Sequence, residues 1–295
     1  MSVLFAGTPA ALVSRMVPRA WCSALVACLV TLDARGASPS FKALEPGVEY
    51  GAVSLVDKPE AGDGKLHVVR VDPNVARLDL GLASESGTMR TAAQWATHRF
   101  SVVMNAGMFE TDYRSNVGHL VHGAHVNQKR WKKTYQSVLA MDPSSPGVPK
   151  VTMLDRDAPD FDEAVKPYQT VVQNLRLIKA PGVNVWKPNG RKWSEAFVAL
   201  DAQGRLLFCF TRTPFEMADL MDRVLALELG VVRAMHVEGG PEASLTVHTK
   251  DVSFDFAGSY ETGFFPRDDN DRQWELPNVI GVRSSATDEP VKDRR

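Results

Sequence analysis

The sequence predicts an α+β protein, with a single domain built around a twisted sheet that is mostly antiparallel or mixed and carries few helices. Two observations support this class. Short runs rich in β-branched and apolar residues recur along the chain, with Pro and Gly residues between them. Only two segments have the periodicity and end signals of a helix, and no internal repeat or long linker divides the chain.

Ten segments have the composition of strands. They cover residues 50–56, 66–71, 78–83, 101–105, 136–141, 170–173, 196–200, 206–211, 231–237 and 278–283. Such a number of strands with so few helices favours antiparallel pairing over a regular alternation of strands and helices.

The first predicted helix is short and covers residues 92–98, after Thr91. The second is better specified, because Thr213, Pro214 and Glu216 read as a capping box with proline in the first turn. We expect this helix to run from Pro214 to about Leu229 and to stop at Gly230. It lies between two predicted strands, which indicates a strand–helix–strand unit with a right-handed crossover.

Composition excludes several classes of function. The chain has 295 residues, 34 basic and 35 acidic, for a formal net charge of -1, and 44% of its residues are hydrophobic. This is enough for a large core, and the balanced charge gives no electrostatic footprint for nucleic acid or an anionic membrane. One cysteine, Cys209, lies outside the N-terminal region, so no internal disulfide is expected. It lies in an apolar strand pattern and is interpreted as a small buried hydrophobe.

The N-terminus has the order of an export signal. Arg15 and Arg19 precede an apolar run over residues 20–32, and we assign residues 1–36 to a signal peptide. Cleavage before Ala37 gives a periplasmic or extracellular protein. A lipoprotein signal that ends at residue 27 instead makes Cys28 a lipid anchor, the only membrane attachment that we expect. The alternative is a cytosolic protein with an apolar N-terminal helix. Residues 285–295 are polar and are interpreted as a flexible tail.

The stretch MHVEGGPEASL, residues 235–245, is the first candidate site. An apolar strand ends on Glu238, two glycines follow, and a second carboxylate, Glu242, comes four residues later. The ends of strands commonly carry binding sites. Gly239 and Gly240 allow close approach of a ligand to backbone N–H groups. The alternative is a tight turn with a solvated glutamate.

Two other strand ends carry polar residues. In SVVMNAGMF, Asn105 can bind sugar hydroxyls, Gly107 permits close approach, and Phe109 offers a face for stacking on a sugar. In VVQNLRLI, Gln173 and Asn174 end an apolar run. A strand followed by a bulge and ordinary turn chemistry are the respective alternatives.

Taken in order, these stretches resemble the phosphodiester glycosidase family, relatives of the lysosomal enzyme that removes N-acetylglucosamine from a phosphodiester. The family's Asn-Gly-Gly-Phe-Phe stands here as NAGMF, residues 105–109, and its Leu-Asp-Gly-Gly-Gly-Ser as VEGGPE, residues 237–242. Shorter matches lie at residues 118–120, 173–178, 201–204 and 216–218. The resemblance covers residues 50–283, implies a family domain over residues 45–284, and identifies the chain as a divergent bacterial member.

The resemblance implies an exported hydrolase that cleaves a sugar from a sugar-phosphate phosphodiester of envelope or exopolysaccharide origin, without a metal or other cofactor. Glu238 is then the catalytic carboxylate and Glu242 its partner. The substrate-binding residues are Asn105, Gly107, Phe109, Gln173, Asn174, Arg191, Lys192, His236, Gly239 and Gly240. Among these, Arg191 and Lys192 are the candidates for the phosphate. They lie in WKPNGRKW, between Trp186 and Trp193, a segment that fits either a hairpin loop or a substrate-facing loop.

The chain departs from the family pattern at four positions. Glu238 replaces an aspartate, Pro241 a glycine and Glu242 a serine, and Glu195 stands where the family tends to have an arginine. These departures motivate an alternative, a glycan-binding or envelope protein that has kept the fold and lost the chemistry. A second alternative is a metal-dependent phosphodiesterase that uses His119, His122 and His125. On a strand, however, a spacing of three places neighbouring histidines on opposite faces.

Overall fold

A computed structural model describes residues 39–283, which all belong to one compact unit. The predicted signal peptide and the predicted tail lie outside the described residues. The described part forms a single α+β domain in which every pairing between named strands is antiparallel. The predicted fold class is therefore confirmed.

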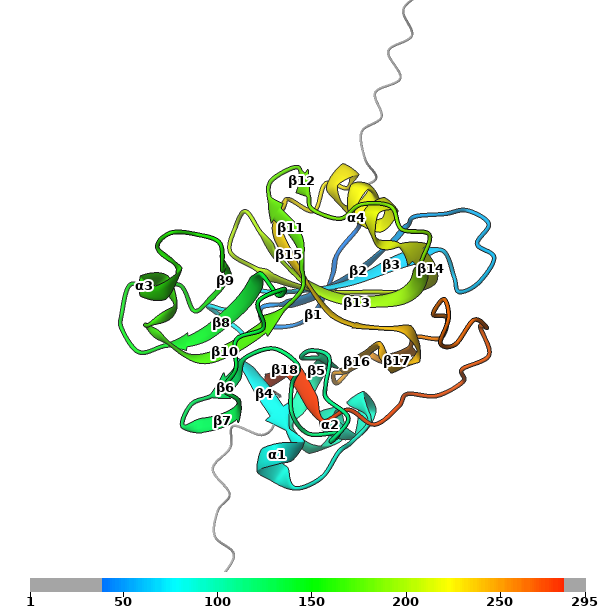
Figure 1. Ribbon diagram of the computed structural model, residues 1–295. Coiled ribbons are helices and arrows are strands. Elements are labelled where there is room, and N and C mark those ends of the chain that lie inside the picture. The colour runs from blue at the N-terminus through cyan, green and yellow to red at the C-terminus, as the bar shows by residue number, and fades with distance from the viewer. Residues whose placement is uncertain (1–38, 284–295) are drawn as a thin grey trace, which may run out of the picture. The chain divides into compact units, whose positions relative to one another are not determined.

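The strands form three sheets (Figure 1). The large sheet has the order β1 (Lys42–Glu45), β2 (Val48–Ser54), β3 (Lys65–Val71), β14 (Leu206–Glu216), β13 (Lys192–Asp201), β15 (Val231–Gly239), β11 (Arg176–Ala180) and β12 (Val183–Asn184). The second sheet has the order β7 (His125–Gln128), β6 (Leu120–His122), β10 (Tyr168–Asn174), β8 (Ser137–Pro143) and β9 (Val151–Asp155). The third has the order β17 (Ser253–Ala257), β16 (Ser244–His248), β5 (Phe100–Asn105), β18 (Asn278–Arg283) and β4 (Leu78–Leu82).

The helices of the described chain are few and short. They are α1 (Ala83–Ser86), α2 (Ala92–Arg99), α3 (Phe161–Val165), α4 (Met217–Ala226) and a 3₁₀ turn, η1 (Gly240–Glu242). Within residues 39–283 no helix has the length and apolarity needed to cross a membrane.

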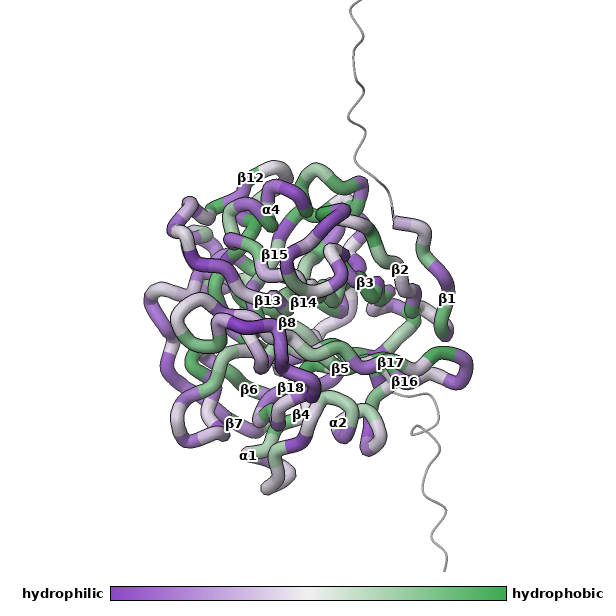
Figure 2. Tube along the Cα trace, turned by 90° about the vertical axis from the view of Figure 1, so that its right-hand side faces the viewer, coloured by the Kyte–Doolittle hydropathy of each residue, from purple (hydrophilic) through white to green (hydrophobic). Residues whose placement is uncertain are grey.

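One hydrophobic core joins the three sheets. It contains Phe208 and Met235 from the large sheet, Leu139 from the second sheet, and Met104 and Ile280 from the third. Hydrophobic residues run along strands such as β2 and β3 (Figure 2). Burial of apolar side chains from all three sheets in one cluster explains why they form one domain.

Three helices cover the opposite faces of these sheets. On the large sheet, Leu220 of α4 packs in a cluster with Phe197 and Cys209, and this cysteine is free and buried, as predicted. Trp95 of α2 packs on the third sheet, and Phe161 of α3 packs on the second. Each sheet is therefore covered on both faces, by the common core on one side and by a helix on the other.

The ten predicted strands are all present, with boundaries that differ by a few residues. The helix predicted after Thr91 is confirmed as α2, with Thr91 and Gln94 forming a capping box. The remaining strands of the described chain, such as β12 and β17, are short or half-exposed, so their apolar pattern is weak.

The predicted start of the second helix is wrong. Residues 213–216 belong to β14, and α4 begins only at Met217. The Thr213 hydroxyl accepts a hydrogen bond from the Gly64 backbone N–H at 2.8 Å, and the Glu216 carboxylate accepts one from Gly190 N–H at 2.8 Å. These long-range donors occupy the two side chains that a capping box requires. Pro214 is accommodated where the register of β13 against β14 shifts.

The unit β14–α4–β15 joins two strands that are not neighbours. Both pair antiparallel with β13, which lies between them, so β14 and β15 run parallel to each other. The predicted stop, Gly230, comes after the helix has ended at Ala226, and its positive φ of 67° turns the chain into β15. This connection delivers β15 to the middle of the large sheet, and the first candidate site lies at the end of β15.

Candidate active site

A pocket of about 240 Å³ lies at the end of β15. His236, Glu238 and Gly239 reach it from β15, and Trp186, Asn189 and Arg191 from the segment between β12 and β13. Trp193, Glu261, Met108 and Leu175 complete its wall. The pocket thus combines carboxylates, one imidazole, one guanidinium and two indoles, a mixture suited to a polar ligand with a flat apolar face.

An irregularity in β15 shapes the pocket. Ala196 lies opposite Glu238 and Phe197 lies opposite His236, so consecutive residues of β13 pair with residues of β15 that are two positions apart. Such a bulge redirects side chains and is frequent beside active sites. Here His236 and Glu238, which flank the extra residue Val237, both line the pocket.

His236 is held by a carboxylate in the interior. Its Nδ1 lies 2.6 Å from Oε1 of Glu195, whose side chain is fully buried. The other carboxylate oxygen of Glu195 accepts a hydrogen bond from Trp193 Nε1 at 2.6 Å. Burial alone would lower the pKa of His236, but the charges of Glu195, and then of Glu238 and Glu261, raise it above its ordinary value. Glu195 therefore fixes the imidazole and favours its protonated form.

The two predicted catalytic carboxylates have strongly shifted pKa values. Burial raises the pKa of Glu238 to about 8, with a further contribution from Glu242 and opposition from His236. Burial, with a contribution from Glu261, raises the pKa of Glu242 to about 7. Carboxyl groups that stay protonated near neutral pH are typical of general acids. Glu238 lines the pocket, whereas Glu242 lies beside it in η1.

The two glycines after Glu238 let neighbouring side chains approach the backbone. A Cβ on Gly239 would lie 2.6 Å from Cδ1 of Trp193. Gly240 has a φ of +63°, and a Cβ there would lie 2.7 Å from Oε2 of Glu261. The absence of side chains at Gly239 and Gly240 therefore allows Trp193 and Glu261 to pack against the end of β15. That the backbone N–H groups of these glycines bind substrate stays a prediction.

Two of the three predicted amide side chains, Asn105 and Asn174, bond to the backbone on either side of this turn. Asn105 donates to the carbonyl of Glu242 at 3.0 Å and accepts from Ser244 N–H at 2.8 Å. Asn174 donates to the carbonyl of Val237 at 3.4 Å and accepts from its neighbour, Leu175 N–H, at 2.7 Å. These contacts place both residues as supports on the two sides of the segment that carries Glu238.

Gln173 lies further from the pocket wall. Its Oε1 accepts hydrogen bonds from the N–H groups of His119 and Lys132, both at 2.9 Å, and its Nε2 donates to the carbonyls of Lys132 and Tyr135. The side chain is fully buried. Through these hydrogen bonds its amide joins the loop that follows β5 to the loop that follows β7.

Gly107 and Phe109 follow β5 on the same side of the domain. A Cβ on Gly107 would lie 2.6 Å from Oδ1 of Asn116 and 3.3 Å from Nδ2 of Asn174. Phe109 contacts Tyr113, with ring centroids 5.9 Å apart, and it is the intervening Met108 that lines the pocket.

The two basic candidates diverge. Arg191 lines the pocket, and its guanidinium lies 3.4 Å from Oε1 of Glu261. Lys192, the next residue, lines a different cavity, of about 590 Å³, together with Phe215 and Arg267. Of this pair, Arg191 is therefore the one that the structure brings to Glu238.

His122 and His125 lie opposite each other in the β6–β7 hairpin, but the three histidines of the metal hypothesis have different partners. His122 contacts Asp79 and Glu85, His125 contacts Ser84, and His119 stacks on Trp131 at 4.0 Å between centroids. Among residues 39–283 no group of three or more His, Cys, Asp or Glu side chains is arranged to hold a metal ion.

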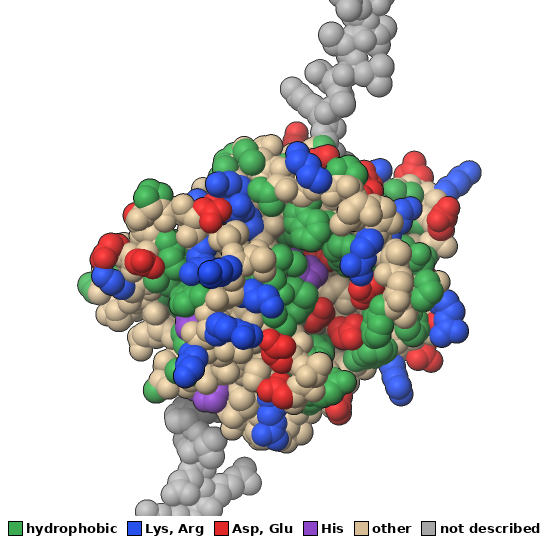
Figure 3. Space-filling view, viewed as in Figure 1, with side chains coloured by type: hydrophobic (Ala, Val, Ile, Leu, Met, Phe, Trp, Pro, Cys, Tyr) green, Lys and Arg blue, Asp and Glu red, His purple; other side chains and the backbone are tan. Residues whose placement is uncertain are grey.

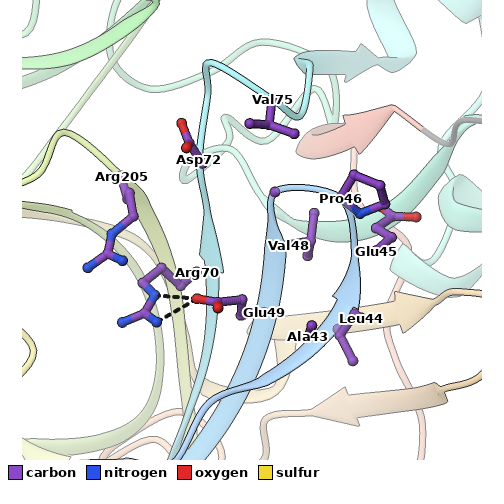
Figure 4. Close-up of a pocket in the computed structure, with 11 residues that line it drawn as sticks. Ala43, Leu44, Glu45, Pro46, Val48, Glu49, Arg70, Asp72, Val75 and Arg205 are labelled. Atoms are coloured by element: carbon purple, nitrogen blue, oxygen red, sulfur yellow. Dashed lines mark hydrogen bonds and ion pairs between the residues drawn. The ribbon is translucent and has the colours of Figure 1, made fainter.

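A larger pocket of about 520 Å³ lies between the β1–β2 hairpin and Arg205 (Figure 4). Its most prominent charged groups, Arg70 and Glu49, are bonded to each other at 2.8 Å, as the dashed lines in Figure 4 show. Its lining has no histidine and no tryptophan, whereas the pocket at the end of β15 brings Glu238, His236 and two indoles together, so we place the chemistry at the end of β15.

Sequence reasoning missed three ionisable residues of this region. Glu195 was noted only as a departure from the family pattern, although an acid within the apolar run SEAFVAL is an available signal of a buried partner. Glu261 has no such signal in its polar loop. Tyr135 lies near the pocket, because its hydroxyl is 3.9 Å from Sδ of Met108, and burial, with contributions from Glu238 and Glu110, raises its pKa to about 12.

Comparison with known proteins places the chain in a family. A family model described as phosphodiester glycosidase matches residues 98–283. No curated protein sequence matches the chain.

The fold is also similar to that of several solved structures. The catalytic domain of zebrafish N-acetylglucosamine-1-phosphodiester alpha-N-acetylglucosaminidase, auto-inhibited by its pro-peptide, has a TM-score of 0.57 and 11% identity over 84% of this chain and 87% of that chain. A hypothetical protein from Synechocystis has a TM-score of 0.50 and 12% identity over 83% and 64%. A putative exported protein from Burkholderia pseudomallei has a TM-score of 0.47 and 10% identity over 75% and 74%. The matched family model spans most of the domain, including β5, β13 and β15, and the chain belongs to the phosphodiester glycosidase family.

Proposed function

We propose that this protein is an exported glycoside hydrolase that releases a sugar from a sugar-phosphate phosphodiester. The observation that carries the proposal is Glu238, a carboxyl group with a pKa of about 8 that lines a pocket walled by two tryptophans and an imidazole. Family membership supports a hydrolase. The name of the similar zebrafish enzyme supports a substrate in which the sugar is joined to phosphate.

The protonation state of Glu238 suits an anionic substrate. An ionised carboxylate would repel a phosphodiester, whereas a neutral carboxyl group can donate a hydrogen bond to the oxygen that joins sugar and phosphate. Cleavage passes through an oxocarbenium-like transition state, and the departing phosphate is a weak base. Glu238 therefore has to orient and partly protonate the leaving oxygen, and a full proton transfer is not needed before the bond breaks.

Glu242 and His236 are the groups available to direct water. The pKa of Glu242 is raised to about 7 and that of Glu238 to about 8, so Glu242 is the first of the two to lose its proton as pH rises. Such a pair supplies the acid and the base of glycoside hydrolysis. His236 is held through Nδ1 by Glu195, and this leaves Nε2 for a substrate hydroxyl or for water.

The remaining wall binds the substrate in this proposal. Trp186 and Trp193 lie with ring centroids 6.1 Å apart and offer apolar faces for a sugar ring. Arg191 is positioned to exchange its contact with Glu261 for the phosphate. The Gly239 N–H donates to Oε1 of Glu238 at 3.1 Å and so helps to hold that carboxyl group, while Gly240 places its backbone at the same end of β15.

The test is a comparison of substrates and variants. We would offer the protein N-acetylglucosamine-1-phosphate methyl ester and the simple methyl glycoside of N-acetylglucosamine, and measure free sugar. We expect release from the phosphodiester, with much less from the simple glycoside. We also expect a loss of at least about 100-fold in Glu238→Gln, because catalytic carboxyl groups contribute factors of this size. Glu163→Gln, at an exposed position, is the matched control and should keep full activity.

Binding of the phosphodiester without any release of sugar would instead favour the alternative that the sequence raised, a glycan-binding protein of this fold. Export is tested separately by fractionation of cells that express the full chain. The basic and apolar order of residues 1–36 supports recovery outside the cytoplasm.

A further inference from the structure

A basic loop precedes Tyr135 in the chain. Residues 129–133 between β7 and β8 read KRWKK, and we call them the basic loop. Its Arg130 lies 3.5 Å from a carboxylate oxygen of Glu110. Lys129, Lys132 and Lys133 have no carboxylate within ion-pair distance among residues 39–283. Three positive charges are thus left unneutralised in a chain whose formal net charge is -1.

The loop is held in place by the core. Both backbone groups of Lys132 bond to the Gln173 side chain, its N–H at 2.9 Å and its carbonyl at 2.8 Å. Trp131 stacks on His119, and the guanidinium of Arg156 lies 5.0 Å from the centroid of the Trp131 ring. A fixed backbone presents its lysines with less loss of conformational entropy on binding than a mobile one would.

The loop is also joined to the pocket. Tyr135, at its end, has its hydroxyl 3.9 Å from Sδ of Met108, and Met108 lines the pocket. Asn174, next to the Gln173 that holds the loop, contacts the carbonyl of Val237, which precedes Glu238. The same strand, β10, therefore supports both the loop and the end of β15.

The pocket and the basic loop differ in how their cations are paired. In the pocket wall, His236 contacts Glu195 and Arg191 lies near Glu261, whereas the three lysines of the basic loop have no carboxylate partner among residues 39–283. Figure 3 shows Lys and Arg side chains gathered over the side of β8 and β10, next to a hollow where acidic side chains and a histidine are visible. A ligand that fits both regions has an uncharged sugar at one end and negative charge beyond it.

We propose that the basic loop binds anionic groups of the substrate beyond the sugar that is released, so that the substrate is a negatively charged glycan chain and not a small phosphodiester. Phosphate and carboxylate groups share this chemistry. The inference rests on the proposed function for the position of the released sugar, but binding to the loop is measurable without cleavage.

The experiment compares two variants with the same loss of charge. Lys129→Gln with Lys133→Gln alters the basic loop, and Lys150→Gln with Lys250→Gln removes two exposed lysines elsewhere. Binding by the full protein is measured calorimetrically with three probes: tetragalacturonate, an oligosaccharide of N-acetylglucosamine units joined by phosphodiesters, and uncharged chitotetraose. A Glu238→Gln background prevents turnover.

We expect the loop variant to bind an anionic probe at least 10-fold more weakly than wild type, and the affinity that remains to depend less on salt. The control variant should bind the anionic probes as wild type does, and neither variant should change the affinity for chitotetraose. A loss with tetragalacturonate alone assigns the loop to carboxylates, and a loss with the phosphodiester probe alone assigns it to phosphates. Equal losses in the two variants, or no loss in either, would overturn the proposal. These binding measurements do not depend on sugar release. The loop can therefore be shown to bind anionic probes even if no sugar is released, and sugar release can be shown even if the loop does not bind them.

Discussion

Nδ1 of His236 lies 2.6 Å from Oε1 of Glu195, and both side chains are almost completely removed from solvent. The two residues come from neighbouring strands, β15 and β13, and are 41 positions apart in the sequence. A buried pair of this kind is costly to break, because removal of one partner leaves an uncompensated polar or charged group in the interior. The pair therefore fixes the orientation of His236 toward the pocket.

Replacement of Glu195 tests this positioning role. Glu195→Ala should destabilise the protein by about 3–5 kcal/mol, as expected when one member of a buried pair is lost. Glu195→Gln keeps the volume and a hydrogen-bond acceptor but removes the charge that raises the pKa of His236. We therefore expect the His236 pKa, followed by NMR, to fall in Glu195→Gln. An unchanged pKa would show that Glu195 does not act through its charge.

The stability of the protein should depend on pH through Glu238. Its pKa is about 8 in the folded state against 4.5 as the ordinary value, so the folded protein holds a proton that the unfolded chain has released between these values. Stability consequently falls as pH rises through this window. The raised pKa of His236 acts in the same direction, because its stabilisation is present at low pH and is lost as pH rises through the folded pKa.

Denaturant unfolding at pH 5 and pH 8 measures this effect. We expect the wild type to lose about 3 kcal/mol more of its unfolding free energy than Glu238→Gln over this interval. Glu163→Gln, at an exposed site, should behave like the wild type. If Glu238→Gln lost as much stability as the wild type, the Glu238 carboxyl group would not carry the raised pKa.

Gly240 should tolerate no side chain. Alanine there requires a φ of +63° and places Cβ 2.7 Å from Oε2 of Glu261, so both backbone strain and a clash arise. Gly204→Ala is the matched control, because it has a φ of +77° but meets no atom within 4 Å. The control should lose about 1–2 kcal/mol from backbone strain alone. Gly240→Ala should lose more in chemical denaturation and should also lose activity; equal losses would show that contact with Glu261 is unimportant.

Gln173 should be a determinant of stability. Gln173→Leu leaves the buried N–H groups of His119 and Lys132 without their partner, at a cost of about 2–4 kcal/mol. Gln136→Leu, at a half-buried position with one side-chain hydrogen bond, should cost less than about 1 kcal/mol. Thermal and denaturant unfolding of the two variants compares them directly, and similar stability in both would contradict the role of the Gln173 amide.

Local patterns predicted most of the fold. Apolar runs placed ten strands, and the Thr91 cap placed α2, because these features depend on residues close in sequence. The start of α4 could not be predicted in this way. Thr213 and Glu216 have the right types and spacing for a capping box, but Gly64 and Gly190 compete for the same oxygens from distant loops.

In the candidate site, too, features set by residues close in sequence could be predicted, and features set by distant contacts could not. The end of β15 was identified from Glu238 and the glycines that follow it, and the structure brings Arg191 and His236 to the same pocket. Sequence could not show that the amide of Asn105 contacts the backbone of Glu242, 137 positions away, or that Glu195 orients His236. Such relationships depend on which strands pair and in what register, and this is set by packing of the whole domain.

The most direct test of the account is the rate of sugar release from the phosphodiester between pH 5 and pH 9, for the wild type and Glu238→Gln. The account predicts a bell-shaped profile for the wild type, with an acidic limb near pH 7 as Glu242 gains a proton and a basic limb near pH 8 as Glu238 loses one. Glu238→Gln should be slower by at least about 100-fold and should lack the basic limb. Wild-type turnover in Glu238→Gln, with the basic limb retained, would contradict the claim that Glu238 is the carboxyl group on which cleavage depends.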